Sequence, residues 1–341
     1  MHDVPYSELR TDPLTGDRVI VAPGRADRPL PLGGSAERPR PPRSDPTCPF
    51  CPGNEAETTT ELYRLPPGEG TGWRLRVFAN KYPALSASVP REFAAPSGPW
   101  ESEPAPGRHE VIVETRRHDL SMTELSDSEL FEVLRTYRGR FAEAAADPQI
   151  KHVVIFRNQG PLANASIFHP HSQLVGLPFV PSLVARKLER SRAHSTERAT
   201  LLTLVGQEVE DSSRLIETTD RYATYVPYAA AHDHEVWVAP RFLPARFDHS
   251  DDGTLQGFGV ALRRALAVVA EGLNDPDYNF ILHTPPLLEH AEDVLPWYGQ
   301  IIPRQTVAAG FELAVGVRIV QTRPEEAAAR LRTALSKVAG V

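Results

Sequence analysis

The chain has 341 residues, a formal net charge of −7, 41% hydrophobic residues and 24% charged residues. These values are typical of a globular protein with a sizeable core, and the acidic balance argues against a nucleic-acid partner held by a general positive field. The sequence contains no run of about 18 apolar residues, so we predict no membrane span, and the first residues lack a secretory signal. Cys48 and Cys51 are the only two cysteines, which favours a reducing cytoplasm.

The first candidate binding residues are Arg25 and Arg28, in the Pro-Gly-Arg-Ala-Asp-Arg-Pro segment at residues 23–29. Two neighbouring arginines can clamp a diphosphate through charge-assisted hydrogen bonds. The alternative is that both side chains are ordinary solvated surface charges, as most arginines are.

The next motif is Cys48-Pro49-Phe50-Cys51, whose spacing lets two thiolates bind one tetrahedral metal ion. A redox pair or inert thiols would show the same spacing, although the preceding proline-rich segment disfavours a thioredoxin-type motif. His118 and His169 are the candidates for two further ligands. The alternatives are a surface histidine for His118 and a hydrogen-bonded loop histidine for His169. A site with four protein ligands would be closed and structural.

The two halves of the chain repeat one order of predicted elements. A His-Glu-Val-x-Val segment occurs at residues 109–113 and again at 234–238, and a predicted strand precedes each, at 75–78 and 222–226. An amphipathic helix and two more strands follow in each half, at 152–156 and 172–175, then at 278–282 and 299–302. The first helix begins at a capping box formed by Ser126 and Glu129.

These elements predict an α+β fold in which two tandem units, each a mostly antiparallel sheet with a helix, join into one extended sheet. We expect a first domain at residues 1–185, a charged helical connector at 186–214 and a second domain at 215–341. A last helix should follow Pro324, with acidic residues in its first turn.

The strongest indication of chemistry is His169-Pro170-His171-Ser172-Gln173. The proline fixes φ and restricts the residue before it, so both imidazoles are held in a stiff, extended geometry. Neutral imidazole is a good nucleophile toward phosphorus and a good metal ligand. We assign the nucleophile to His171 and the metal ligand to His169.

Attack by His171 on the α-phosphorus of a nucleotide would form a covalent phosphoramidate and divide one transfer into two steps. One ring nitrogen must be free and the other must donate a proton, for which a backbone carbonyl of the same loop is a suitable acceptor. Gln173 lies on the same strand face as His171 and can donate its amide to a phosphoryl oxygen. Ser166 and the small-residue loop before it can donate a hydroxyl and backbone N–H groups.

Taken together, the motifs resemble the galactose-1-phosphate uridylyltransferases of the histidine-triad superfamily, which include the related ADP-glucose phosphorylases. The resemblance covers nearly the whole chain, including His118 and residues 9–16, 25–29, 48–54, 78–85, 158–160, 169–173 and 310–312. It implies histidine-triad-like repeats and ping-pong nucleotidyl transfer through His171, with Gln173 stabilising the phosphoryl group. It also implies a homodimer with sites near the subunit interface.

The resemblance assigns further residues to ligands. It implies one structural zinc ion at Cys48, Cys51, His118 and His169. Its nucleotide contacts map onto Arg25, Arg28, Phe78, Asn80, Asn158, Gly160 and Ser166, and the hexose contact maps onto Glu312.

The chain also departs from the family pattern. Some members hold a second metal with a glutamate and three histidines, but here only His283 remains, with Tyr298 and Gln300 where two histidines would be. We therefore predict no second metal. The segments at 274–279 and 283–286 resemble the ADP-glucose phosphorylase branch more closely.

The first hypothesis is transfer of UMP between a UDP-hexose and a hexose 1-phosphate. The alternatives are an ADP-sugar phosphorylase, in which inorganic phosphate is the acceptor, and a non-catalytic zinc-stabilised nucleotide-binding protein. A hydrolase is disfavoured because an extended acceptor site is expected. The partners are therefore a nucleotide sugar with a sugar 1-phosphate or phosphate.

Overall fold

A computed structural model describes residues 6–25, 40–68, 72–86, 98–194 and 199–338. Within these residues, ten strands form one large sheet and three strands form a small one. The large sheet contains β3 (Glu61–Leu65), β4 (Leu75–Ala79), β5 (Arg108–Val113), β6 (His152–Gln159), β7 (His171–Leu177), β8 (Leu215–Thr218), β9 (Tyr222–Tyr225), β10 (Val236–Pro240), β11 (Tyr278–His283) and β12 (Tyr298–Pro303). The small sheet contains β1 (Glu8–Thr11), β2 (Arg18–Val21) and β13 (Arg318–Val320).

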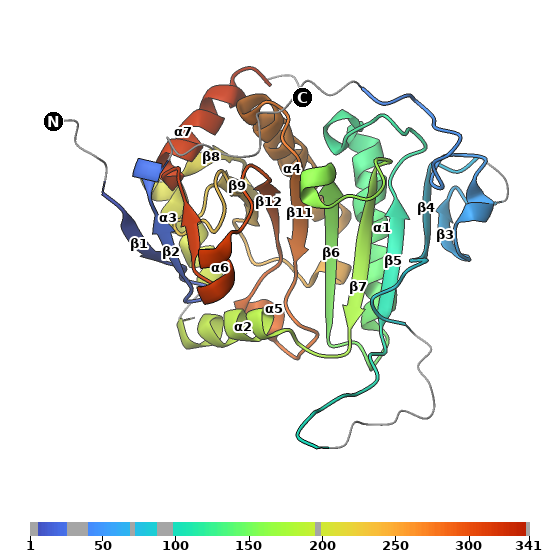
Figure 1. The fold of residues 1–341 in the computed structure, drawn as a ribbon, viewed down its shortest axis with the longest axis horizontal. Helices are drawn as coiled ribbons and strands as arrows, with labels where there is room; N and C mark the ends of the chain where they lie inside the picture. The colour runs from blue at the N-terminus through green and yellow to red at the C-terminus, as the bar shows by residue number, and fades with distance from the viewer. Residues whose placement is uncertain (1–5, 26–39, 69–71, 87–97, 195–198, 339–341) are drawn as a thin grey trace.

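The order of strands in the large sheet is β3-β4-β5-β7-β6-β11-β12-β10-β9-β8. The second half of this order mirrors the first, because β11, β12, β10, β9 and β8 correspond to β6, β7, β5, β4 and β3. The two halves meet at the centre of the sheet, where β6 and β11 pair antiparallel with Phe156 opposite Ile281 (Figure 1). The predicted α+β fold of two tandem units in one extended sheet is confirmed.

The described helices have the following bounds: α1 (Asp127–Ala145), α2 (Ser182–His194), α3 (Thr200–Asp211), α4 (Asp252–Leu273), α5 (Ala291–Val294), α6 (Gly310–Val315) and α7 (Pro324–Leu335). The predicted capping box starts α1, since the Glu129 amide donates to Ser126 Oγ and the Ser126 amide donates to the Glu129 carboxylate. Among the described residues, no helix combines the length and the apolar character that a bilayer crossing requires.

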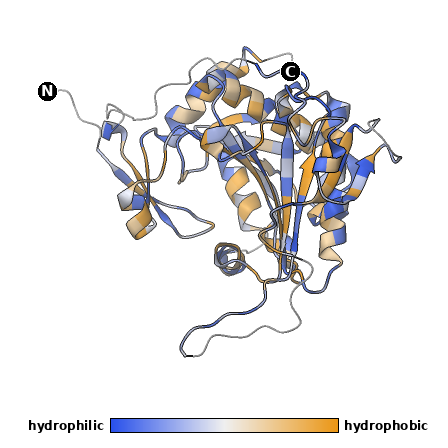
Figure 2. Ribbon diagram, turned by 45° about the vertical axis from the view of Figure 1, so that its right-hand side comes forward, coloured by the Kyte–Doolittle hydropathy of each residue, from blue (hydrophilic) through white to orange (hydrophobic). Residues whose placement is uncertain are grey.

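The main core lies between one face of the sheet and the paired helices α1 and α4, which contact each other. Leu134 on α1 lies against Gly259 on α4, and both residues are fully buried. On the strands, alternate residues such as Val153 and Leu174 point into this core. Figure 2 shows hydrophobic residues concentrated in the central strands and along the helices that cover them.

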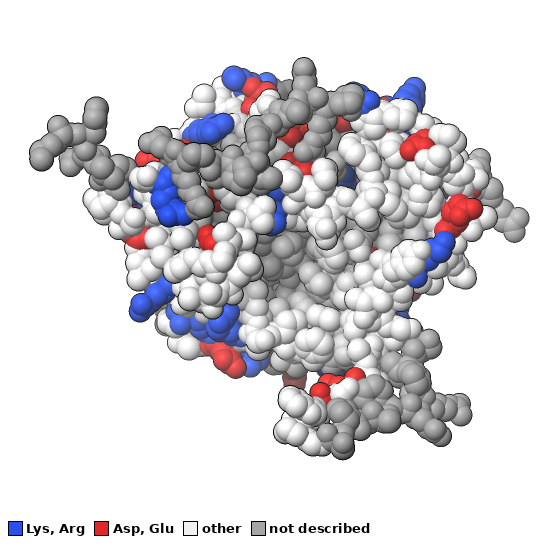
Figure 3. Space-filling model, viewed as in Figure 1, with Lys and Arg blue, Asp and Glu red and all other residues white. Residues whose placement is uncertain are grey.

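The opposite face of the sheet is covered differently in the two halves. In the second half, Leu201 and Val205 of α3 pack on Tyr225 and Trp237. In the first half, a loop that contains Cys48 and Cys51 packs there on β4 and β5, and α3 does not reach it. Figure 3, seen from the side of Figure 1, shows a surface hollowed near its middle, with charged side chains mostly towards the rim.

The structure contains strands that the sequence analysis did not predict. β3 and β8 form the outer edges of the large sheet. In that sheet, three strands and not two therefore precede α1 in the first half and α4 in the second. The small sheet joins the two ends of the described chain, because β13 pairs parallel with β2. The strand predicted at 234–238 begins at Val236, because His234 has a φ of 57°, outside the extended region.

Candidate active site and metal centre

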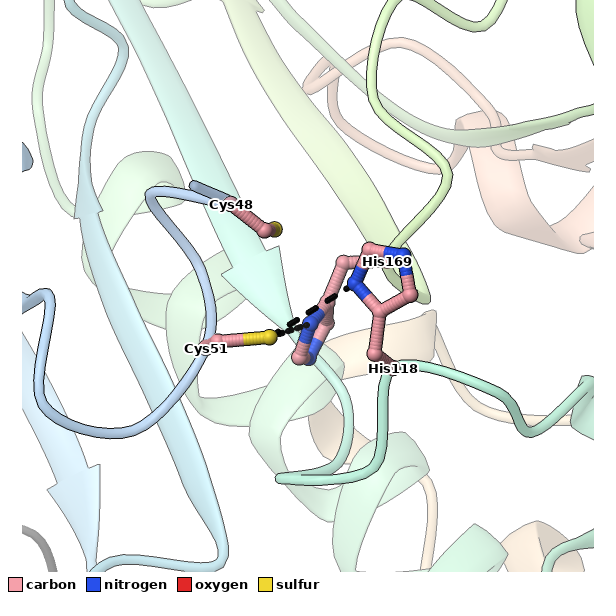
Figure 4. A group of neighbouring side chains, drawn as sticks. All are labelled: Cys48, Cys51, His118 and His169. Carbon is pink, nitrogen blue, oxygen red and sulfur yellow. Dashed lines mark hydrogen bonds between the residues drawn. The ribbon is translucent and has the colours of Figure 1, made fainter. Parts of the chain in front are cut away.

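The four predicted metal ligands converge from three loops of the first half (Figure 4). Cys48 and Cys51 precede β3, His118 follows β5, and His169 lies just before β7. The sulfur of Cys51 lies 3.6 Å from His118 Nδ1 and 3.5 Å from His169 Nδ1. One ligand atom from each of the four residues lies within 4.8 Å of all the others, and all four residues are buried.

Hydrogen bonds orient these side chains for a metal ion. His169 Nε2 lies 2.7 Å from the carbonyl oxygen of Thr115. Because a carbonyl only accepts, Nε2 carries the proton and the Nδ1 lone pair faces Cys51, the arrangement typical of a metal-bound histidine. The backbone amides of Asp45 and Phe50 donate to the sulfurs of Cys51 and Cys48 at 3.3 and 3.4 Å.

Burial favours the neutral forms of these groups while no ion is bound. It raises the pKa of the Cys48 thiol and lowers the pKa of His169 to about 4, because both charged forms lose water. A metal ion favours thiolate and neutral imidazole at the same time. The cluster therefore fits one metal ion, and a site with four protein ligands has no open position for substrate.

The imidazole of His171 is held in one tautomer. Its Nδ1 lies 2.8 Å from the carbonyl oxygen of His169, so Nδ1 carries the proton and Nε2 keeps its lone pair. The ring is buried and packs edge-on against Phe50, with 5.1 Å between ring centroids. Burial lowers the pKa of His171 below its ordinary value, which favours the neutral form that a nucleophile needs.

His171 lines a cavity of about 770 Å³ on the face of the sheet that the Cys48–Cys51 loop covers. Four other predicted site residues line it as well: Gln173 on β7, Phe78 on β4, Asn80 just after β4 and Ser166 in the loop before β7. The cavity therefore combines a nucleophilic nitrogen, amide and hydroxyl donors and an aromatic wall. This set is suited to attack on the phosphoryl group of a ligand whose planar ring packs on the aromatic wall.

Asn158, near the end of β6, and Gly160, just after it, are not among the residues that line this cavity, and Gly160 shapes the loop after β6. Asn158 is on the sheet face of His171, and its Oδ1 accepts a hydrogen bond of 2.9 Å from Asn279. Gly160 has a φ of 81°, and an added Cβ would lie 1.9 Å from a carboxylate oxygen of Asp277. Asp277 in turn accepts the backbone amide of Leu162 at 2.6 Å.

Two further predicted binding residues lie elsewhere in the chain. Arg25 and Glu312 line a separate cavity of about 730 Å³, together with His232, Arg304 and Arg318. The structure therefore does not bring them to His171 within one chain. Arg28 lies outside the described residues.

Sequence analysis did not recognise the part that His109 plays in the site. Its ring lines the His171 cavity, and its Nε2 lies 2.7 Å from Gln173 Oε1. The only signal was its position at the start of the repeated His-Glu-Val-x-Val segment, which we used to align the two halves.

A buried polar network supports β7 from the helix face of the sheet, and this too was missed. Glu114 accepts hydrogen bonds from Ser172, from Arg157 and, at 2.7 Å, from the Tyr137 hydroxyl. A carboxylate buried with this many donors is costly to disturb, because any broken contact leaves a charge unpaired. The network therefore fixes the strand segment that carries His171.

The residues at the second-metal positions contact one another and Lys187. His283 lies 2.6 Å from Gln300 Oε1 and stacks on Tyr298, and the buried ammonium of Lys187 donates to the Tyr298 hydroxyl at 2.8 Å. A metal ion there would lie beside a cationic side chain, and the Gln300 amide already donates to the buried Glu235 carboxylate at 2.6 Å. That this chain holds no second metal stays a prediction.

We expect removal of one metal ligand to release the ion and to weaken the fold, because ligands that converge only in the native state link metal binding to folding. Elemental analysis should find one equivalent of metal in the parent and none in His118→Ala, which should also unfold at a lower temperature. His249→Ala removes an exposed histidine and should leave both values unchanged. A metal-free His118→Ala protein with the melting temperature of the metal-loaded parent would contradict the structural role.

We expect opposite effects from two Gly→Ala substitutions. Gly160→Ala should lower the free energy of unfolding by at least about 1–3 kcal/mol, because φ is positive and the new Cβ meets Asp277. Gly139→Ala on α1 meets nothing within 4 Å and should be neutral or stabilising by up to about 1 kcal/mol. Urea unfolding of both variants measures the difference, and equal effects would show that the Gly160 turn is not constrained.

Comparison with known proteins identifies the family of this chain. Residues 1–181 match the family described as galactose-1-phosphate uridyl transferase, N-terminal domain. An ADP-glucose phosphorylase of Arabidopsis thaliana is 33% identical over 330 residues, which cover 95% of this chain and 92% of that protein. A galactose-1-phosphate uridylyltransferase of Cryptococcus neoformans is 30% identical over 352 residues, covering 96% and 90% of the two chains.

A solved structure shows the same architecture. The crystal structure of an ADP-glucose phosphorylase from Arabidopsis thaliana with bound ADP-glucose has a TM-score of 0.81 and 30% identity, covering 96% of this chain and 98% of that one. The family resemblance seen in the motifs is thereby confirmed. The chain is an enzyme of the galactose-1-phosphate uridylyltransferase family.

Proposed function

We propose that the protein is an ADP-sugar phosphorylase that converts an ADP-hexose and inorganic phosphate into ADP and a hexose 1-phosphate. The observation that carries the proposal is the His171 ring, whose Nδ1 donates to the His169 carbonyl while Nε2 keeps its lone pair beside the cavity. Similarity supports the adenine nucleotide, since identity to the phosphorylase is 33% and to the Cryptococcus uridylyltransferase 30%.

In the first step, His171 Nε2 attacks the α-phosphorus of the ADP-hexose. A P–N bond forms, the bond from the α-phosphorus to the bridging oxygen breaks, and hexose 1-phosphate leaves. The charge that develops on the α-phosphoryl oxygens needs donors already in place. Gln173 and Ser166 line the cavity and can supply an amide and a hydroxyl there.

In the second step, an oxygen of inorganic phosphate attacks the adenylylated histidine. The P–N bond breaks, ADP forms, and the imidazole returns to its neutral form. The same donors serve both steps, because both pass through attack on the same phosphorus. Phe78 and Asn80 line the cavity and would contact the nucleoside.

We propose that the metal in the Cys₂His₂ cluster is zinc. Zinc–sulfur and zinc–nitrogen bonds of about 2.3 and 2.0–2.1 Å at the tetrahedral angle place sulfur and nitrogen about 3.5 Å apart. The separations of Cys51 Sγ from His118 and His169 are 3.6 and 3.5 Å. Zinc would hold the loop of residues 48–51 against the histidine loop and take no part in the transfer itself.

Transfer of UMP between a UDP-hexose and a hexose 1-phosphate, the first hypothesis from the sequence, is the second candidate. The 30% identity to the Cryptococcus uridylyltransferase favours it. Both activities would use the same His171 chemistry and differ in the base and the acceptor. A substrate panel therefore separates them.

We expect brief incubation with ADP-glucose labelled at the α-phosphate to place acid-labile label on His171, and phosphate to release it as ADP. UDP-glucose should label the protein more slowly, and galactose 1-phosphate should be the poorer acceptor. His171→Ala should take up no label, whereas His249→Ala, which removes an exposed histidine, should behave as the parent does. Absence of label with every nucleotide sugar would refute nucleotidyl transfer, and faster labelling by UDP-glucose would favour uridylyl transfer.

We infer further that the enzyme works as a homodimer in which one subunit completes the site of the other. Arg25 and Glu312 line a cavity separate from that of His171 within one chain. The family resemblance implies sites near a subunit interface, and the arginines of the second cavity suit a diphosphate or a sugar phosphate.

Mixing two inactive variants tests the shared site. A dimer of His171→Ala and Arg25→Ala subunits has one intact site if Arg25 acts across the interface, and none if it acts within its own chain. After co-refolding or co-expression we expect about a quarter of the parental activity from a statistical mixture. No recovery, with the mixed dimer shown to form, would place Arg25 in the site of its own subunit or outside any site.

A further inference from the structure

His109 makes two contacts that together define its protonation state. The backbone amide of Ala84 donates to His109 Nδ1 at 3.0 Å, and His109 Nε2 lies 2.7 Å from Gln173 Oε1. A backbone amide is only a donor, so Nδ1 must keep its lone pair. The neutral ring then carries its proton on Nε2 and donates it to the oxygen of the Gln173 amide.

Asn80 supplies a second donor to the same oxygen. The Tyr82 backbone amide donates to Asn80 Oδ1 at 2.8 Å, which turns the Asn80 amide nitrogen toward His109 and Gln173. That nitrogen lies 3.4 Å from Gln173 Oε1 and 3.1 Å from His109 Nε2. Asn80 Nδ2 and His109 Nε2 are both donors, so they do not bond each other. They lie close together because both donate to one acceptor, Gln173 Oε1.

This convergence selects one of the two orientations of the Gln173 amide. Its oxygen faces His109 and Asn80, so its NH₂ group faces the other way. On the sheet, His109 lies opposite Val175, two residues beyond Gln173, whereas His171 lies two residues before it. The amide nitrogen is therefore left for the part of the cavity that His171 lines.

We propose that His109 is a positioning residue for nucleotidyl transfer, which holds Gln173 so that its amide donates to a phosphoryl oxygen during attack by His171. The inference rests on the proposed function. Without His109, the Gln173 amide can rotate, and its oxygen then faces the phosphoryl group and repels it. The cost should fall on the rate of attack more than on ground-state binding, because the charge on the phosphoryl oxygens grows in the transition state.

The test is a double-mutant cycle on the first half-reaction, with single-turnover labelling of His171 by ADP-glucose as the assay. We expect His109→Phe to slow labelling by about 10- to 100-fold, less than the 10²–10³-fold typical for loss of a whole donor. The dissociation constant of ADP-glucose should change less than about 3-fold. In a Gln173→Met background the same His109→Phe change should slow labelling less than about 2-fold further.

A conservative variant and a structural readout complete the design. His109→Gln places an amide nitrogen near the former Nε2 position and should recover at least about a third of the parental rate. In the parent, ¹⁵N-labelled histidine should report His109 as a neutral ring protonated at Nε2. Melting temperatures identify any variant that fails to fold, and His109→Gln then carries the comparison alone.

Several results would overturn the proposal. These are parental labelling by His109→Phe, an equal slowing with and without Gln173, or a His109 ring protonated at Nδ1. If the parent protein takes up no label from any nucleotide sugar, the proposed function itself fails. If the parent is labelled normally but the effects of His109→Phe and Gln173→Met are additive, the positioning role of His109 is refuted and the proposed function stands.

Discussion

The site depends on His169, whose side chain belongs to the Cys₂His₂ cluster and whose main chain holds His171, the proposed nucleophile. Its Nε2 donates to Thr115, so its Nδ1 faces Cys51, while its carbonyl oxygen accepts the proton of His171 Nδ1. Pro170 between the two histidines accepts the Glu114 amide at 3.2 Å, which continues the pairing of β5 and β7 beyond the strands. Any shift of the cluster would therefore move the acceptor that fixes the tautomer of His171.

The cluster also builds a wall of the cavity. Phe50, inside the Cys-Pro-Phe-Cys segment, packs on His171 and lies 5.5 Å from the ring of Phe78. A metal ion bound by Cys48 and Cys51 would therefore hold the aromatic side chain against the nucleophile. This gives a closed structural site an effect on chemistry without contact between the ion and the substrate.

Much of the fold follows from local sequence, because alternation and helical spacing are local properties. The capping box at Ser126, the strand carrying His171 and the central β11 were all predicted. The small sheet was not, since β2 and β13 are nearly 300 residues apart and nothing in either short segment identifies the other. The edge strand β3 was missed because it is half exposed and carries charged residues, which weakens its pattern.

The candidate site could be predicted where a motif holds its residues close in sequence, as in the segment around His171. The metal set required pairing Cys48 and Cys51 with distant histidines, for which the residues alone left alternatives open and which the family resemblance also implied. The link from His109 to Gln173 could not be predicted, because it depends on the register of β5 against β7. A shift of one residue would turn His109 to the helix face of the sheet.

The second half carries no counterpart of the proposed reactive histidines, yet the register explains why the site still needs it. β6 would be an edge strand of the first half alone, with a row of unpaired backbone groups next to the catalytic strand. β11 pairs with it instead, and Asn279 on β11 donates both to Asn158 Oδ1 and to the carbonyl oxygen of Ala163. The loop between β6 and β7 is thus anchored by the other half of the chain. The second half of the sheet thus contributes order to the site, and the proposed nucleophile lies in the first half.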